Sequence, residues 1–216
     1  MKRILLVLVL SISVSSLFAQ DIRLPTPSGN SGTELLSAIQ NRRISKSFVK
    51  RDIPAADLST ILWSALGMRG VDAVSSATKA GRTISFSGEN AYINIYFLTD
   101  KGSWKYLADT NTLQFLKSGD ARSSVSPAAV PTAAAMILFT VDNTLTPSFL
   151  KANPTLFLQM SHATAGFAAQ NIGLIASALK LASVVQYNVK AQGAIDNLKL
   201  AKDEVPLFIQ QLGYTE

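Results

Sequence analysis

The chain has no cysteine among its 216 residues, so disulfides, thiolate nucleophiles and thiolate metal sites are excluded. It has a single histidine, His162, which is expected at the start of a long helix. The sequence also lacks a nucleophile elbow, a phosphate-binding P-loop, a dinucleotide-binding glycine motif and a zinc-protease motif. No catalytic or metal-binding residue is therefore predicted, and an enzyme with this sequence would take its chemistry from a bound cofactor.

Charge is also scarce, because charged residues make up 16% of the chain and the formal net charge is +6. No run of basic residues interleaved with aromatic residues is present, so no nucleic-acid partner is predicted. The mild positive balance suits a small anionic ligand or an acidic surface.

Residues 1–19 have the features of a cleavable secretory signal peptide. Lys2 and Arg3 form a positive start, and Ala19 offers a small residue for cleavage. The apolar stretch Ile4–Phe18 is shorter than the ~20 residues that a spanning helix needs. We therefore expect a periplasmic or secreted protein with no stable membrane insertion after cleavage.

Residues 20–32 are rich in Pro, Ser, Gly and Asn and predict an extended arm, and residues 33–216 have the size of one domain. Apolar periodicity and turn residues predict helices over 33–41, 53–66, 162–181 and 191–198. The same reasoning predicts strands over 91–98, 104–107, 113–116, 133–141, 182–187 and 205–212. The strand 133–141 is almost continuously apolar, which is typical of a central strand buried on both faces. These elements predict a domain of the α+β class.

One cluster of cations lies between the first two predicted helices. Arg42, Arg43 and Lys46 fall within five residues, together with Ser45 and Ser47. Guanidinium groups match phosphate oxygens in pairs and lysine adds a point charge, so the cluster is a candidate phosphate clamp. A solvated basic turn is the alternative interpretation of the same residues.

The ordered motifs of the chain resemble the nitroreductase superfamily. The stretch NRRISKSFVKRDIPAADLSTILWSALGMRG is similar to the opening of the short SagB-type dehydrogenase branch. GRTISFSGENAYINIYF resembles the segment and strand that follow in that branch, and AGFAAQNIGLIASALKLASVV resembles its central helix. DEVPLFIQQLGY resembles the closing strand. The resemblance spans residues 33–214.

This resemblance implies an α+β nitroreductase-like fold with a central, mostly antiparallel sheet flanked by helices. It implies a homodimer that binds flavin mononucleotide (FMN) at the interface between its subunits. It further implies an oxidoreductase in which flavin N5 accepts hydride from a donor, with electrons passing on to a small organic acceptor. No acid, base or nucleophile is then required from the chain.

The resemblance also implies which residues bind the cofactor. Arg42, Arg43 and Lys46 match contacts to the phosphate and the ribityl chain. The remaining positions match contacts to the flavin ring, and they are Ser85, Phe86, Ser87 and Asn90 in one loop and Val185, Gln186 and Tyr187 at a strand end.

Several positions depart from the pattern of the family. Ile44 replaces a serine, Ser85-Phe86 replaces Pro-Ser, and Gln186 stands where some relatives carry arginine. These departures keep a second hypothesis open, a non-catalytic flavin-binding or scaffold protein on the same fold. An unrelated enzyme such as a hydrolase is a third and weaker hypothesis, because the catalytic motifs of that class are missing.

Overall fold

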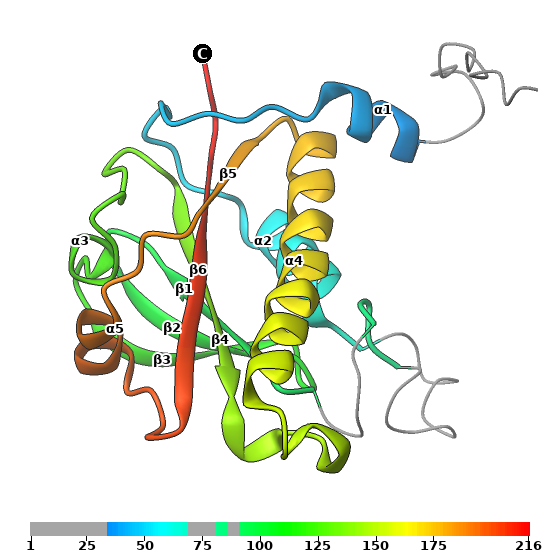
Figure 1. Ribbon diagram of the computed structural model, residues 1–216. Helices are drawn as coiled ribbons and strands as arrows, with labels where there is room; N and C mark the ends of the chain where they lie inside the picture. Colours follow the sequence, from blue (N-terminus) through cyan, green and yellow to red (C-terminus); the bar gives the residue numbers. More distant parts are fainter. Residues whose placement is uncertain (1–33, 69–80, 86–90) are drawn as a thin grey trace, which may run out of the picture.

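The computed structural model describes residues 34–68, 81–85 and 91–216 (Figure 1). Within them, six strands form one sheet in the order β3-β2-β1-β4-β6-β5, and every neighbouring pair is antiparallel. The strands are β1 (Ile93–Leu98), β2 (Gly102–Leu107), β3 (Thr112–Ser118), β4 (Ala135–Asp142), β5 (Ala182–Gln186) and β6 (Glu204–Gly213). The predicted α+β architecture with a mostly antiparallel central sheet is confirmed.

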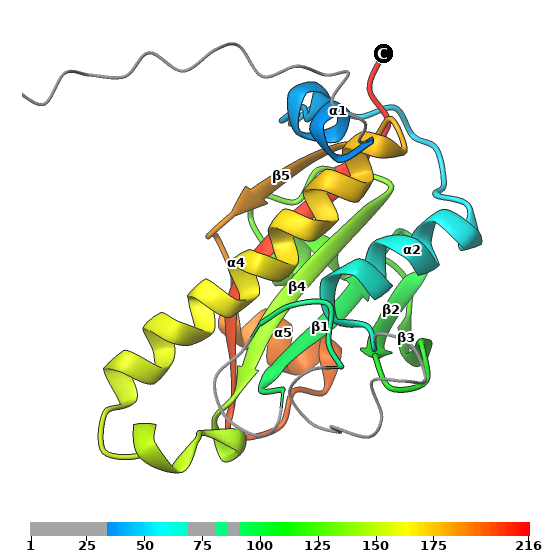
Figure 2. The same cartoon turned by 90° about the vertical axis from the view of Figure 1, so that its right-hand side faces the viewer.

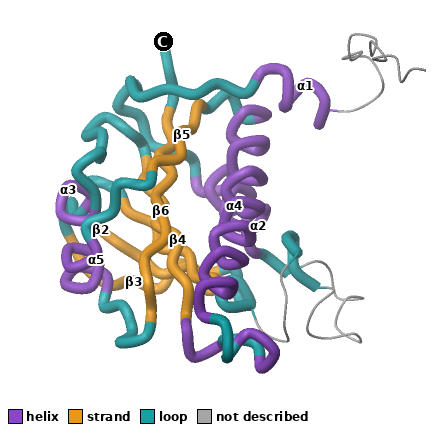
Figure 3. The backbone as a smooth tube through the Cα atoms, in the orientation of Figure 1, coloured by secondary structure: helices purple, strands orange, loops and turns teal. Residues whose placement is uncertain are grey.

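Helices cover both faces of this sheet (Figures 1 and 3). One face carries α1 (Glu34–Asn41), α2 (Ala55–Leu66) and the long α4 (Pro154–Ala178). Figure 2 shows α2 and α4 side by side in front of the strands. The other face carries α3 (Arg122–Val125) and α5 (Ala191–Leu198), and two short 3-10 turns, η2 (Asn143–Leu145) and η3 (Ser148–Leu150), precede α4.

The strand β4 shows why the sheet is covered on both sides. Its side chains alternate between two cores: Ile137 and Phe139 join the core under α4, while Met136 and Leu138 join the core under α5. All four are fully buried, as the continuous apolar run predicts.

The helix α4 begins earlier than its apolar pattern indicates. Asn153 caps it by accepting a hydrogen bond from the Leu156 main-chain N–H at 3.0 Å, and Pro154 occupies its first turn. The expectation that His162 lies at a helix N-terminus is therefore wrong, because Asn153 and Pro154 supply the start signal eight residues upstream.

The predicted signal peptide 1–19 and the predicted arm 20–32 lie outside the described residues. Among the helices that the structure describes, none combines the length and apolarity needed to cross a bilayer.

Candidate functional site

The predicted cation segment directly follows α1 and crosses the start of β5. The Arg43 carbonyl accepts a hydrogen bond from the Ser183 main-chain N–H at 3.2 Å. Arg42, Arg43 and Lys46 are exposed, and none of the salt bridges among the described residues involves them. Their charges are therefore directed outward and are available to an external anion.

The stem of Arg42 lies against α4 at Gly173. A Cβ atom added at Gly173 would stand 3.7 Å from Arg42 Cδ, 3.5 Å from Ser183 Oγ and 3.9 Å from Gln210 Nε2. The small residue thus lets α4, β5 and the cation segment approach one another closely.

Gln210 lies beneath this contact and is 1% exposed. Its Nε2 donates to the Ala169 carbonyl at 3.1 Å and to Ser183 Oγ at 3.4 Å. Its Oε1 is buried and has no hydrogen-bond partner among the described residues. An unsatisfied buried acceptor costs about 1–3 kcal/mol, so Gln210 is held here at some cost to stability.

From Gly173 a face of small residues continues along α4. His162, Gly166, Ala169 and Gly173 follow a spacing of four, three and four residues, which places them on one side of the helix. A Cβ added at Gly166 would meet no atom within 4 Å, so the space beside it is open. The rise from 162 to 173 is about 16 Å along the helix axis.

Aromatic rings close the other end of this face. The His162 ring stacks on Phe208 with centroids 6.2 Å apart, and the Tyr187 ring lies 5.6 Å from the same Phe208. Val185 and Tyr187, two predicted ring contacts, are both exposed. The structure therefore brings both to the side of β5 that carries Ser183, along which Arg42 also lies.

Gln186 does not share this side. Its Oε1 accepts a hydrogen bond from Gln211 Nε2 at 2.5 Å, and successive side chains of a strand point to opposite faces. Gln186, the third predicted residue of the strand end, thus has its side chain engaged in a hydrogen bond within the fold.

The other predicted ring-contact loop approaches α4 from a different direction. Asn171 Nδ2 donates to the Thr83 carbonyl at 3.4 Å and to the Ser64 carbonyl at 2.9 Å, which ties α4 to the segment before Ser85. Side chains two positions apart on a helix do not face each other, so Thr83 and Arg42 contact different sides of α4. Ser85 is exposed, and Phe86, Ser87 and Asn90 lie outside the described residues.

Sequence reasoning missed a further cation, Lys180. It lines a hollow of about 200 Å³ together with Arg43 and Asn41, next to a second hollow of about 490 Å³ beside α1. Lys180 follows α4 with a positive φ of 63°, and only the tertiary fold brings it to Arg43. The local sequence around Gly173 and Gln210 does not indicate that these residues belong to the site either.

A more apolar hollow of about 540 Å³ lies at the start of α4. Leu158, one turn before His162 on the same face, lines it together with Phe157 and Val205. Lys151 is a charged residue in its wall. The small-residue face of α4 thus runs from a cationic end to an apolar end.

No protein-family model and no curated protein matches the chain. Solved structures do match. A Ralstonia eutropha protein described as a nitroreductase is 23% identical with a TM-score of 0.72, and the match covers 89% of this chain and 88% of the other. The Escherichia coli microcin synthetase complex McbBCD, solved with truncated pro-MccB17, contains a chain that is 14% identical with a TM-score of 0.64, covering 98% and 85%. The NADPH:FMN oxidoreductase of Vibrio harveyi, complexed with NAD+, is 18% identical with a TM-score of 0.55, covering 84% and 69%.

Proposed function

We propose that this chain, which has the nitroreductase fold, is an exported FMN-dependent oxidoreductase that reduces a small organic acceptor. The observation that carries the proposal is Arg42 packed against Gly173 at one end of an open helix face, with the exposed cations Arg43 and Lys46 in the same segment. The residues present fit the cofactor. The exposed cations suit its phosphate, and the open space beside Gly166 leaves room along the helix.

A homodimer is part of the proposal. The segment before Ser85 and the segment of Arg42 contact different sides of α4, so a second chain is needed to bring both kinds of predicted contact to one ligand. Several large apolar side chains of this region are exposed, including Trp63, Leu158 and Phe167. Exposed apolar surface of this kind favours an interface.

In this arrangement each residue has a binding or positioning role. When bound, FMN supplies a hydride acceptor and donor at N5, chemistry that no side chain provides. Arg42, Arg43 and Lys46 bind the phosphate, and Tyr187 and Val185 border the ring end. The largely apolar hollow at Leu158 accommodates the acceptor.

Export sets the source of the cofactor. The ordinary secretory route carries unfolded chains, so a chain with the predicted signal peptide would take its flavin from the surroundings. It would also need an electron donor present outside the cytoplasm.

A non-catalytic protein on the same fold is the second candidate. It is favoured by Gln186, whose side chain is engaged by Gln211 rather than directed along the small-residue face. Such a protein would form a stable dimer whose melting temperature does not respond to FMN.

Reconstitution separates these candidates. The purified protein is mixed with excess FMN, desalted and examined by visible spectroscopy, then reduced anaerobically and offered a quinone and a nitroaromatic compound. We expect bound flavin, reduction by a donor and reoxidation by an acceptor. Bound flavin that no acceptor reoxidises supports a non-catalytic flavin-binding protein. No bound flavin contradicts the oxidoreductase and leaves the non-catalytic scaffold as the supported candidate.

A further inference from the structure

The cation segment is held at its far end by the last residues of the chain. Val49 N–H donates to the Tyr214 carbonyl at 2.8 Å, which makes an isolated antiparallel bridge beyond the end of β6. The Arg51 guanidinium carbon lies 4.1 Å from the centroid of the Tyr214 ring, within the range of a cation–π contact. Tyr214 thus contacts the segment through both its main chain and its side chain.

Phe48 fixes the same stretch by packing. It is buried in a small cluster with Ala182 and Val184 of β5. A Cβ at Gly213 would stand 2.7 Å from Phe48 Cδ1, so the ring fills the space that a side chain there would need. The chain following the cations is therefore fitted against the end of β6.

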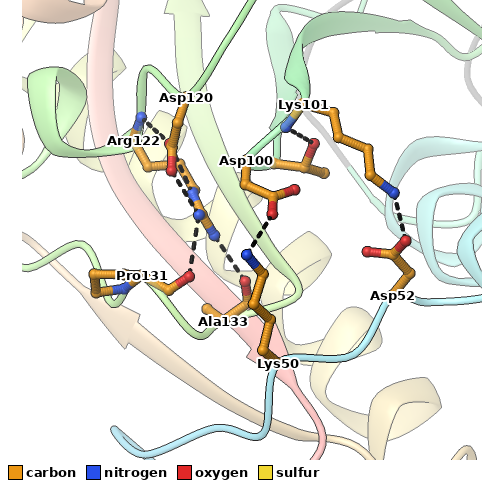
Figure 4. A network of polar contacts seen from close by, with 9 residues as sticks. Lys50, Asp52, Asp100, Lys101, Asp120, Arg122, Pro131 and Ala133 are labelled. Atoms are coloured by element: carbon orange, nitrogen blue, oxygen red, sulfur yellow. Dashed lines mark hydrogen bonds and ion pairs between the residues drawn. The ribbon is translucent and has the colours of Figure 1, made fainter.

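Charged pairs continue this attachment toward the turn between β1 and β2 (Figure 4). Lys50 Nζ lies 3.2 Å from Asp100 Oδ2, and Asp52 pairs with Lys101. Lys50, Asp52 and Lys101 are well exposed, so each pair stabilises the attachment only weakly. The contacts to Tyr214 combine a hydrogen bond with a ring, which makes Tyr214 the stronger anchor.

We propose that Tyr214 is a positioning residue for the anion-binding segment. Its carbonyl and ring hold Val49 and Arg51, while Ser183 holds Arg43 at the other end, and Lys46 lies between these two anchors. That the segment binds the phosphate of FMN rests on the proposed function. Its attachment by Tyr214 does not require FMN and can be tested in the flavin-free protein.

Limited proteolysis of the flavin-free protein tests this holding directly. Trypsin cleaves after Arg43 and Lys46, and when opening is fast its rate follows the population of the opened segment. Tyr214→Ala removes the ring, and Tyr214→Phe keeps it. A chain ending at Gly213 also loses the carbonyl partner of Val49, and a chain ending at Tyr214 is its matched control.

We expect cleavage after Arg43 and Lys46 to be about twofold to fivefold faster in Tyr214→Ala, the factor that loss of an exposed cation–π contact corresponds to. The chain ending at Gly213 should be cleaved at least as fast, while Tyr214→Phe and the chain ending at Tyr214 should match the unchanged protein. If the chain ending at Gly213 does not fold, the comparison of Tyr214→Ala with Tyr214→Phe decides the question.

FMN affinity gives the second readout. It should fall in Tyr214→Ala by a similar factor and be restored in Tyr214→Phe, an effect that a general loss of stability would not produce. Equal cleavage rates in Tyr214→Ala and the unchanged protein overturn the inference. Faster cleavage in a protein that never binds FMN supports the inference and contradicts the proposed function.

Discussion

Arg42 lies across Gly173, with its Cδ 3.7 Å from the position that a Cβ of residue 173 would take. A methyl group at this point makes only ordinary contacts, so Gly173→Ala should fold normally. Removing a helical glycine should raise the free energy of unfolding by about 0.4–1 kcal/mol. Urea denaturation measures this gain.

A larger side chain at the same place should act on binding. Gly173→Leu should displace the Arg42 stem and weaken FMN binding about tenfold or more, corresponding to a loss of about 1.4 kcal/mol. Fluorescence titration with FMN compares it with Gly173→Ala. Equal affinities in both variants would show that Arg42 does not bind the ligand from this position.

Replacing Glu204 should lower the stability of the fold independently of the candidate site. Its buried carboxylate accepts hydrogen bonds from Asn94, Tyr96 and Thr140 and so joins β1, β4 and β6. Burial, and then the charge of Glu204, raises the pKa of Tyr96, so Tyr96 remains a protonated donor. Glu204→Ala removes the acceptor of two buried hydroxyls, those of Tyr96 and Thr140.

The expected loss in Glu204→Ala is about 2–4 kcal/mol of unfolding free energy, because each orphaned buried group costs about 1–3 kcal/mol. Glu204→Gln keeps one acceptor oxygen and should lose less. Chemical denaturation gives both values. An alanine variant as stable as the unchanged protein would contradict the structural role of this cluster.

Gly213 should tolerate no side chain. Its Cβ would collide with the fixed part of the Phe48 ring, and overpacking of this kind typically costs about 1–3 kcal/mol. Thermal denaturation of Gly213→Ala should show the loss. Adding Phe48→Leu should recover part of the lost stability. If the stability loss of the double variant equals the sum of the losses in the two single variants, the predicted contact is contradicted.

The pair Asp120–Arg122 predicts a dependence of stability on pH. The Arg122 guanidinium donates to Asp120 through Nε at 2.9 Å and Nη2 at 2.7 Å, and these hydrogen bonds lower the pKa of Asp120 (Figure 4). The folded state therefore binds fewer protons than the unfolded chain. The contribution is present above the unfolded aspartate pKa of about 3.9 and is lost as the pH falls through the lower folded value.

Asp120→Asn should accordingly be less stable than the unchanged protein at pH 7 by about 1 kcal/mol, because the Asp120 side chain is 40% exposed and solvent screens the interaction. The difference should shrink toward pH 3, where the Asp120 carboxyl of the unfolded chain is protonated while the folded protein still resists protonation. Urea denaturation at both pH values measures it. An equal difference at pH 7 and pH 3 would contradict the assigned charge interaction.

Local patterns predicted most of the fold. The apolar run at 133–141 predicted a doubly buried strand, and β4 is that strand at the centre of the sheet. The four-residue helix α3 was not predicted. Its Arg122 is buried by bonds to the carbonyls of Pro131 and Ala133, which local periodicity does not reveal.

The candidate site was predictable only in part. Arg42, Arg43 and Lys46 are adjacent in sequence, so their charges stand out without a structure. Gly173 and Tyr214 reach them through the folding of α4 and the exit of β6, contacts between residues more than 100 positions apart. A single sequence contains no signal for such pairings.

The most direct test of the account is a calorimetric titration of FMN into the purified protein and into Arg42→Ala/Lys46→Ala. Lys117→Ala/Lys202→Ala removes the same charge elsewhere and serves as the control. The account predicts saturable binding by the unchanged protein and the control. It predicts binding at least about tenfold weaker in the Arg42→Ala/Lys46→Ala protein, since a hydrogen bond to a charged group contributes about 1.5–3 kcal/mol. Equal affinity in all three proteins, or no binding by the unchanged protein, would contradict it.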